Sequence, residues 1–102
     1  MGSTAALVTE RDEERDVVHD PGNVLHRLLP SADDKSSHIL RYIDWYGVTL
    51  FNRLQIGAFI EEWRTLYSKA WSEEAQSILN RIEQCAQKVQ DGVHLYLKFI
   101  GD

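Results

Sequence analysis

The four histidines and the single cysteine are the side chains of this 102-residue chain best suited to metal binding or proton transfer. His19, His26, His38 and His94 stand at irregular intervals, and Cys85 has no second cysteine to complete a ligand pair. No HxH or HExxH motif occurs. The sequence therefore predicts no metal site and no bound cofactor.

Adjacent acids occur at positions 33–34, 61–62 and 73–74. Paired carboxylates can act as general acid and base, but neighbouring residues of a helix point about 100° apart and do not converge. Two of these pairs stand near expected helix starts, where the helix dipole favours negative charge. The chain also lacks a glycine-rich phosphate loop and a serine elbow. We therefore expect no enzyme activity; the alternative is a small helical enzyme or ligand sensor with a site assembled between helices.

Aromatic and polar residues that favour protein binding are densest between residues 42 and 55. Tyrosine and tryptophan offer large amphipathic surfaces at low entropic cost and dominate binding hot spots. Tyr42 and Trp45 stand three positions apart, beside the expected core stripe of a helix. Polar side chains near them would add specificity to the binding. The alternative is that these aromatics complete the core. The predicted protein-binding residues are Tyr42, Asp44, Trp45, Asn52 and Arg53.

The last thirty residues carry the most regular apolar pattern. Apolar residues recur there at alternating intervals of four and three, which keeps one stripe of a helix facing a partner. Ser72 is a good N-cap for this helix, which we expect to run to Gly101, with Asp91-Gly92 as the place where a bend or break is cheapest. The stripe consists of Ala75, Leu79, Ile82, Ala86, Val89, Val93, Tyr96 and Ile100.

Three further helices are expected upstream of Ser72. A short one follows the cap Asp20 and ends before Pro30, and a second runs to about Tyr46 with Ile39, Ile43 and Tyr46 in its core stripe. A third begins with Asn52 and Gln55 as its cap and extends to about residue 70. The segment 48–51 is β-branched and apolar, so it could be extended, but we interpret it as a connector or a single turn. The predicted fold class is all-α: residues 20–102 form a bundle of three main helices and a short N-terminal one.

Acidic charge is concentrated at the N-terminus. The formal net charge is −5, and residues 1–20 hold six acids but only two bases. Because residues 1–19 combine high charge with few large apolar groups, we expect them to form a flexible, disordered acidic arm. The alternative is an acidic segment that docks on a basic partner.

Several partner classes and compartments are disfavoured by composition. No lysine or arginine stripe could neutralise a row of phosphates, so nucleic-acid binding is not expected. No apolar run approaches the roughly 18 residues of a membrane span, and the N-terminus lacks the apolar centre of a signal peptide. A single cysteine cannot form an internal disulfide. These features predict a cytoplasmic protein without membrane contact.

Two segments resemble a family of small bacterial proteins that has no assigned function. In the segment 42–55, the residues Ile43, Asp44, Tyr46, Gly47, Thr49, Phe51 and Asn52 match the family's Ile-Asp-Pro-Tyr-Gly-Asp-Thr turn with its following Phe-Asn. Trp45 replaces the proline of that pattern, and Val48 replaces its second aspartate. The ending His94–Asp102 is also similar. The resemblance implies a bacterial cytosolic origin and no particular activity.

The function expected from the sequence is that of a non-enzymatic protein-interaction module. Small acidic proteins of this kind are similar in general character to toxin-neutralising immunity proteins, so the expected partner is a toxin or a regulated protein. Within the same class, the alternative is a homodimer whose last helices pair.

Overall fold

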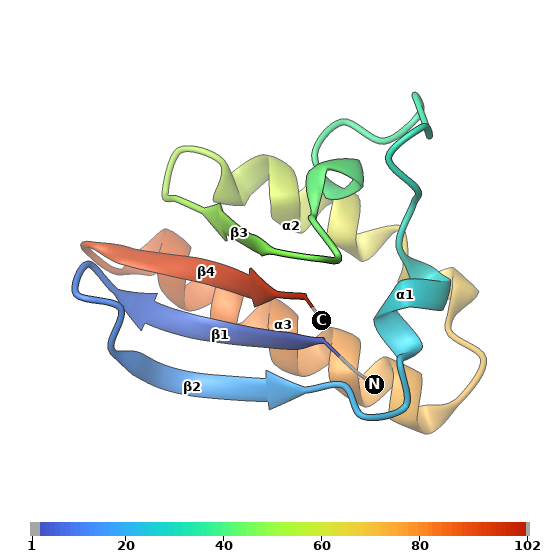
Figure 1. Ribbon diagram of the computed structural model, residues 1–102, viewed down its shortest axis with the longest axis horizontal. Coiled ribbons are helices and arrows are strands. Elements are labelled where there is room, and N and C mark those ends of the chain that lie inside the picture. The colour runs from blue at the N-terminus through green and yellow to red at the C-terminus, as the bar shows by residue number, and fades with distance from the viewer. Residues whose placement is uncertain (1–2, 102) are drawn as a thin grey trace.

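The computed structural model describes residues 3–101 and shows an α+β fold: a four-stranded antiparallel sheet with helices packed on one face (Figure 1). The strands are β1 (Thr4–Thr9), β2 (Glu14–His19), β3 (Val48–Phe51) and β4 (Leu95–Ile100), in the spatial order β2-β1-β4-β3. The helices are α1 (Val24–Leu28), α2 (Ile56–Arg64) and α3 (Glu73–Asp91), with 3-10 turns η1 (Leu40–Tyr42) and η2 (Tyr67–Lys69). The expectation of an all-α helical bundle is therefore wrong.

The N-terminal segment contributes two strands of the sheet instead of the expected arm. Residues 4–19 form the β1–β2 hairpin, and β1 also pairs with β4, so that Ala5 faces Phe99 and Leu7 faces Leu97. Charge is confined to the hairpin turn and β2, whereas β1 is uncharged and its four central residues are buried. Because β1 and β4 come from opposite ends of the chain, residue 19 does not separate an arm from a body.

The apolar stripe of the last helix is correct only as far as Asp91, where α3 ends. Ala75, Leu79, Ile82, Ala86 and Val89 are buried, as expected for a core face. Beyond Gly92 the chain turns and continues as β4, in which alternate side chains face the core. A helix of about 28 residues would measure roughly 42 Å, whereas the longest dimension of the molecule is 33 Å.

Gly92 makes the turn between α3 and β4 sterically feasible. A Cβ atom at this position would overlap the side chain of Leu95 and would lie 2.8 Å from the carbonyl oxygen of Lys88. His94 then adopts a left-handed conformation with φ of 59°. The apolar stripe of α3 packs against the sheet and α2 of the same chain. It is therefore not an open face for pairing with another α3.

The helix expected to end at Tyr46 is replaced by irregular chain around η1. The carboxylate of Glu62 accepts hydrogen bonds from the backbone N–H groups of His38, Ile39 and Leu40. These contacts fix the segment in a loop and so compete with helix formation. Tyr46, expected in the core, is 88% exposed.

The expected helix starts are confirmed at three positions. The Asp20 carboxylate accepts 2.8 Å hydrogen bonds from the N–H groups of Val24 and Leu25. The side-chain oxygen of Asn52 accepts from the N–H of Gln55, whose side-chain oxygen accepts from the N–H of Asn52, a reciprocal capping box. Ser72 accepts from the N–H of Ala75 at the start of α3.

The core lies between the inner face of the sheet and the layer formed by α2 and α3. Phe59 and Trp63 of α2 stack with centroids 5.0 Å apart, and both rings pack against Phe99 of β4. Phe51 of β3 joins this aromatic cluster through Phe59 and Phe99. Among residues 3–101, no helix has the length and apolar character needed to cross a bilayer.

Candidate interaction surface

Strand β3 lies at one edge of the sheet and carries apolar side chains on both of its faces. Phe51 points inward and is buried, whereas Val48 and Leu50 point to the outer face and are 55% and 51% exposed. This outer face is opposite to α2 and α3 in Figure 1. The segment expected to be a connector is therefore a strand that presents apolar groups to solvent.

Exposed apolar side chains cluster around this strand. Seven large hydrophobic residues are exposed within residues 3–101, and five of them fall between residues 42 and 54. Contiguous exposed apolar area on a single chain commonly marks an interaction site. We call the part of this cluster on or beside β3 the β3 surface, and it comprises Tyr46, Val48, Leu50 and Leu54.

A tight turn holds Tyr46 at the start of β3. The carboxylate of Asp44 accepts a 2.9 Å hydrogen bond from the N–H of Tyr46, and the N–H of Asp44 donates to the Thr49 hydroxyl at 2.8 Å. The N–H of Gly101 donates to the carbonyl of Gly47 at 2.7 Å, which ties the turn to the end of β4. Gly47 in the turn before β3 and Gly101 after β4 therefore lie side by side.

Close backbone packing in this turn requires glycine at position 101. A Cβ atom on Gly101 would overlap the backbone carbonyl group of Trp45, and backbone cannot rotate away as a long side chain can. The turn and the last strand are consequently fitted to each other. This fit determines where the β3 surface begins.

Glu62 fixes the chain that leads into the turn. Its carboxylate accepts hydrogen bonds from the Ser37 hydroxyl and from three successive backbone N–H groups, those of residues 38–40. Partial burial by itself raises the pKa of Glu62, but these four hydrogen bonds together outweigh it and hold the pKa below its usual 4.5. Glu62 is therefore ionised at neutral pH and acts as an anchor within the fold.

A hollow of about 270 Å³ lies on the outer face of the sheet beside Val48 and Leu50. Its wall includes Tyr96 and the stem of Lys98 from β4, and its rim carries the acids Glu10 and Asp12. The remaining lining residues are Val8 and Thr9. The hollow thus combines apolar walls with an acidic rim.

Each acid on this rim contacts a basic side chain of the protein itself. Lys98 Nζ lies 2.8 Å from Asp12 Oδ1, and Nδ1 of His94 lies 2.5 Å from Glu10 Oε1. The carboxylates of Glu10 and Asp12 are more than half exposed, so solvent weakens both contacts. A cation of a partner could therefore compete for these carboxylates at small cost.

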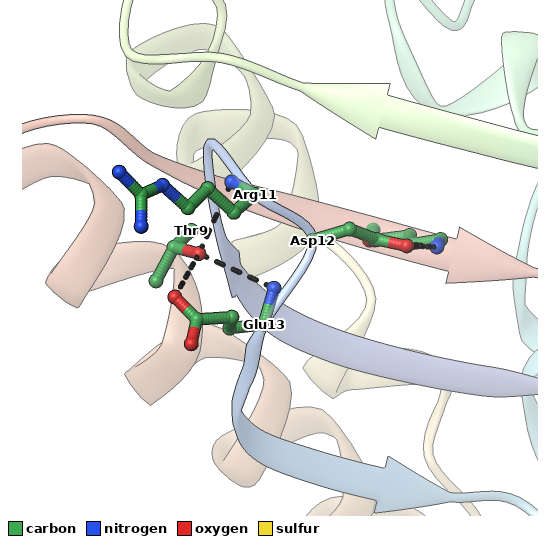
Figure 2. Close-up of polar contacts among 5 residues, drawn as sticks. Thr9, Arg11, Asp12 and Glu13 are labelled. Carbon is green, nitrogen blue, oxygen red and sulfur yellow. Dashed lines mark hydrogen bonds and ion pairs between the residues drawn. The ribbon is translucent and has the colours of Figure 1, made fainter.

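The turn of the β1–β2 hairpin is built around Thr9 (Figure 2). The hydroxyl of Thr9 accepts hydrogen bonds from the N–H groups of Arg11 and Glu13, at 3.3 and 3.2 Å. Asp12 occupies the left-handed position of the turn with φ of 63°. In Figure 2 the Asp12 side chain points away from the Thr9 network, and it forms the ion pair with Lys98 of β4.

The structure separates the five residues predicted from the sequence as binding residues. Tyr42 is 61% exposed and lies against the Arg41 guanidinium. Trp45 is half-buried, packs on the core and meets the ring of His26 edge-on at 5.0 Å. Asp44 is exposed in the turn before β3.

The other two predicted residues lie at the far end of β3. The side chain of Asn52 is occupied in capping α2, and Arg53 is exposed. With Leu54 they border a second hollow of about 290 Å³ that also reaches His94 and Tyr96. Because Tyr96 borders both hollows, the two adjoin along β4.

None of the four members of the β3 surface is among the five binding residues predicted from the sequence. A connector at residues 48–51 gives Val48 and Leu50 no defined face, and Tyr46 is expected in the core. A signal was present, since an apolar run with β-branched residues beside a glycine is typical of a strand. Taken as a strand, the run would have placed Val48 and Leu50 on one face.

Residues 3–101 contain no group of three or more histidine, cysteine or acidic side chains placed to hold a metal ion. Cys85 is buried in α3, and burial together with the nearby Asp16 carboxylate raises its pKa to about 11, so the thiolate is scarce at neutral pH. The distinctive feature of the described chain is therefore the β3 surface and its adjoining hollows.

Comparison with protein-family models, with curated proteins and with solved structures finds no match to this chain.

Proposed function

We propose that this chain is a non-enzymatic protein-interaction module that works in the cytosol and binds a protein partner through the β3 surface. The observation that carries the proposal is the concentration of exposed apolar side chains in and around one edge strand, with Tyr46 88% and Leu54 92% exposed at its two ends. A single buried cysteine fits a reducing compartment.

The character of the surface favours a partner that is apolar at its centre and basic at its margin. Leu50 and Tyr96 border a hollow whose rim carries Glu10 and Asp12. Apolar anchors supply most of the binding energy at such interfaces, while complementary charge steers association and selects the partner. A toxin or a regulated enzyme with a basic surface is the class of partner that this chemistry would recognise.

Affinity capture from the source organism with matched variants tests the proposal. The double variant Leu50→Asp/Leu54→Asp places charge in the β3 surface at positions that are at least half exposed. The control variant Gln76→Asp/Gln84→Asp adds the same charge to exposed positions of α3. Circular dichroism should show that both variants remain folded.

We expect the wild-type chain and the α3 control to retain the same protein, and the β3-surface variant to lose it. The captured protein should then bind purified wild-type chain directly, with affinity reduced about tenfold or more by the β3-surface substitutions. Equal capture by all three chains, or loss only in the α3 control, would contradict the proposal.

A further inference from the structure

The outer edge of β3 exposes backbone hydrogen-bonding groups that no strand covers. The N–H of Gly101 bonds to the carbonyl of Gly47, and in an antiparallel ladder the bonded positions alternate. Thr49 and Phe51 are therefore the residues bonded to β4. It follows that the N–H and C=O groups of Val48 and Leu50 point away from the sheet.

The opposite edge of the sheet is covered by side chains at Val17, whereas β3 has no such cover within the described chain. By the same alternation the backbone of Val17 in β2 points outward. Its N–H donates to the Asp16 carboxylate at 2.9 Å, and its carbonyl accepts from the Arg81 guanidinium at 3.4 Å. Within residues 3–101, the outward backbone groups of Val48 and Leu50 have no hydrogen-bond partner of this kind.

Charge also distinguishes the two edges. Three of the six residues of β2 are charged, a usual protection against pairing with another strand, whereas the four residues of β3 carry no charge and include no proline. The side chains of Val48 and Leu50 are about half exposed, which agrees with an open edge. Strand β3 therefore has the properties of an edge that accepts a further strand.

An exposed carboxylate at the start of β3 indicates the charge of the incoming strand. The N–H of Asp44 donates to the hydroxyl of Thr49, and a Cβ atom on Gly47 would lie 2.7 Å from the Asp44 carboxylate, so this carboxylate lies on the inner side of the strand where it begins. Its carboxylate accepts one backbone N–H and forms no ion pair within residues 3–101. A residue paired opposite Thr49 would direct its side chain to this same side, so a basic side chain there would meet Asp44.

We propose that an extended segment of a partner protein, with apolar and basic residues in alternation, adds to β3 as an antiparallel fifth strand. Its backbone would exchange hydrogen bonds with Val48 and Leu50, and its apolar side chains would lie beside theirs on the outer face. Its lysine or arginine side chains would lie on the Asp44 side. This inference rests on the proposed function and specifies how the β3 surface holds its partner.

Electrostatics favours such a partner over a second copy of this chain. Two copies pairing antiparallel through β3, with Val48 opposite Leu50, would be related by a two-fold axis at Thr49. Both Asp44 carboxylates would then lie on the same face of the paired sheet, where like charges repel. A basic strand replaces this repulsion with attraction.

A short blocked peptide of alternating lysine and valine provides the probe, and the same peptide with glutamate in place of lysine is its control. Proton–deuterium exchange followed by NMR on the full chain should show slower exchange at the amides of Val48 and Leu50 when the lysine peptide is added. The amide of Val17, already bonded to Asp16, should be unaffected. The glutamate peptide should bind at least about tenfold more weakly, and Asp44→Asn should reduce that preference.

Two substitutions at one position separate backbone pairing from side-chain contact. Leu50→Pro removes an outward N–H and leaves the ladder to β4 intact, as edge strands tolerate, so peptide binding should fall about tenfold or more. Leu50→Thr keeps the N–H and should preserve the protection of both amides.

The possible outcomes distinguish this inference from the proposed function. Slower exchange that appears only as the protein concentration rises, without peptide, would identify a second copy as the occupant and overturn the inference. No protection by either peptide, or equal binding by the Leu50→Pro chain, would also overturn it. Partner capture that is lost in the Leu50→Asp/Leu54→Asp variant but retained in Leu50→Pro would leave the interaction function standing and reject strand addition alone.

Discussion

The indole N–H of Trp63 in α2 donates a 3.0 Å hydrogen bond to the backbone carbonyl of Leu79 in α3. Both residues are fully buried, and the indole also stacks on Phe59. One side chain therefore joins the two helices of the inner layer through packing and through a polar contact.

Replacing Trp63 with phenylalanine should lower the free energy of unfolding by about 1–3 kcal/mol, because the substitution removes the hydrogen bond and leaves a cavity. Urea unfolding followed by circular dichroism measures the change. Trp71→Phe is the matched control, since Trp71 is half exposed and the Arg27 guanidinium lies over its ring, 4.4 Å from the centroid. The control should cost less than about 1 kcal/mol. Equal decreases in the free energy of unfolding of the two variants would show that Trp63 does not stabilise the packing of α2 against α3.

Ile82 occupies the centre of the buried stripe of α3, where it is fully enclosed. Ile82→Ala should cost about 2–5 kcal/mol, since it removes buried methyl groups and creates a cavity. The exposed Gln84, two residues further along the same helix, is the control, and Gln84→Ala should change stability by less than about 0.5 kcal/mol. Thermal or urea unfolding gives both values, and a small effect at Ile82 would disagree with the observed packing.

Glu62 should make stability depend on pH in the acidic range. Its pKa in the folded chain lies below the ordinary 4.5, so its contribution is fully present above that value and is lost as the pH falls through the folded-state pKa. Glu62→Gln should therefore lower the free energy of unfolding by about 1–3 kcal/mol at pH 7. The difference in unfolding free energy between this variant and wild type should narrow below pH 4.

The adjacent Glu61 supplies the control for this effect, because it is exposed. Urea unfolding of wild type, Glu62→Gln and Glu61→Gln at several pH values gives the comparison. Glu61→Gln should follow the wild-type curve throughout. A gap between wild type and Glu62→Gln that stays constant from pH 7 to pH 3 would mean that the Glu62 carboxylate does not bind the loop through its charge.

Cys85 should react slowly with alkylating reagents while the protein is folded. Burial and the Asp16 carboxylate raise its pKa to about 11 from an ordinary 9.0, so the reactive thiolate is about a hundredfold scarcer at pH 8 than in an unfolded chain. Mass spectrometry after iodoacetamide treatment, with and without urea, should show at least this difference, since burial also limits access. Rapid alkylation in the folded state would indicate that α3 opens away from β2.

Short-range chemistry determined several parts of this structure in a way that the sequence alone reveals. The caps Asp20 and Ser72 act on residues at most five positions away, so their sequence context is sufficient to predict them. The buried face of α3 was likewise predictable up to Asp91, since helical periodicity is a local property of the chain.

Contacts between distant segments decided the fold class and the candidate surface. β1 reads as a short apolar stretch in a charged terminus, and it becomes a central strand only because β4 pairs with it from the other end of the chain. β4 continues the helical spacing of α3, yet its alternate residues face the core once Gly92 turns the chain. For such segments, strand and helix cannot be distinguished by local propensity, and the burial gained by pairing determines which forms.

The β3 surface depends entirely on this long-range pairing. Residues 48–51 become an edge strand because β4 bonds to one side of them. Tyr46 is displaced from the core because Glu62 and Thr49 bind the backbone of the segment that precedes it, at Ile39 and Asp44. The sequence by itself established that Tyr42 to Gln55 is rich in binding-type residues. Which of these side chains face solvent was decided only by the tertiary structure, because exposure depends on the partners that the rest of the chain brings to each strand.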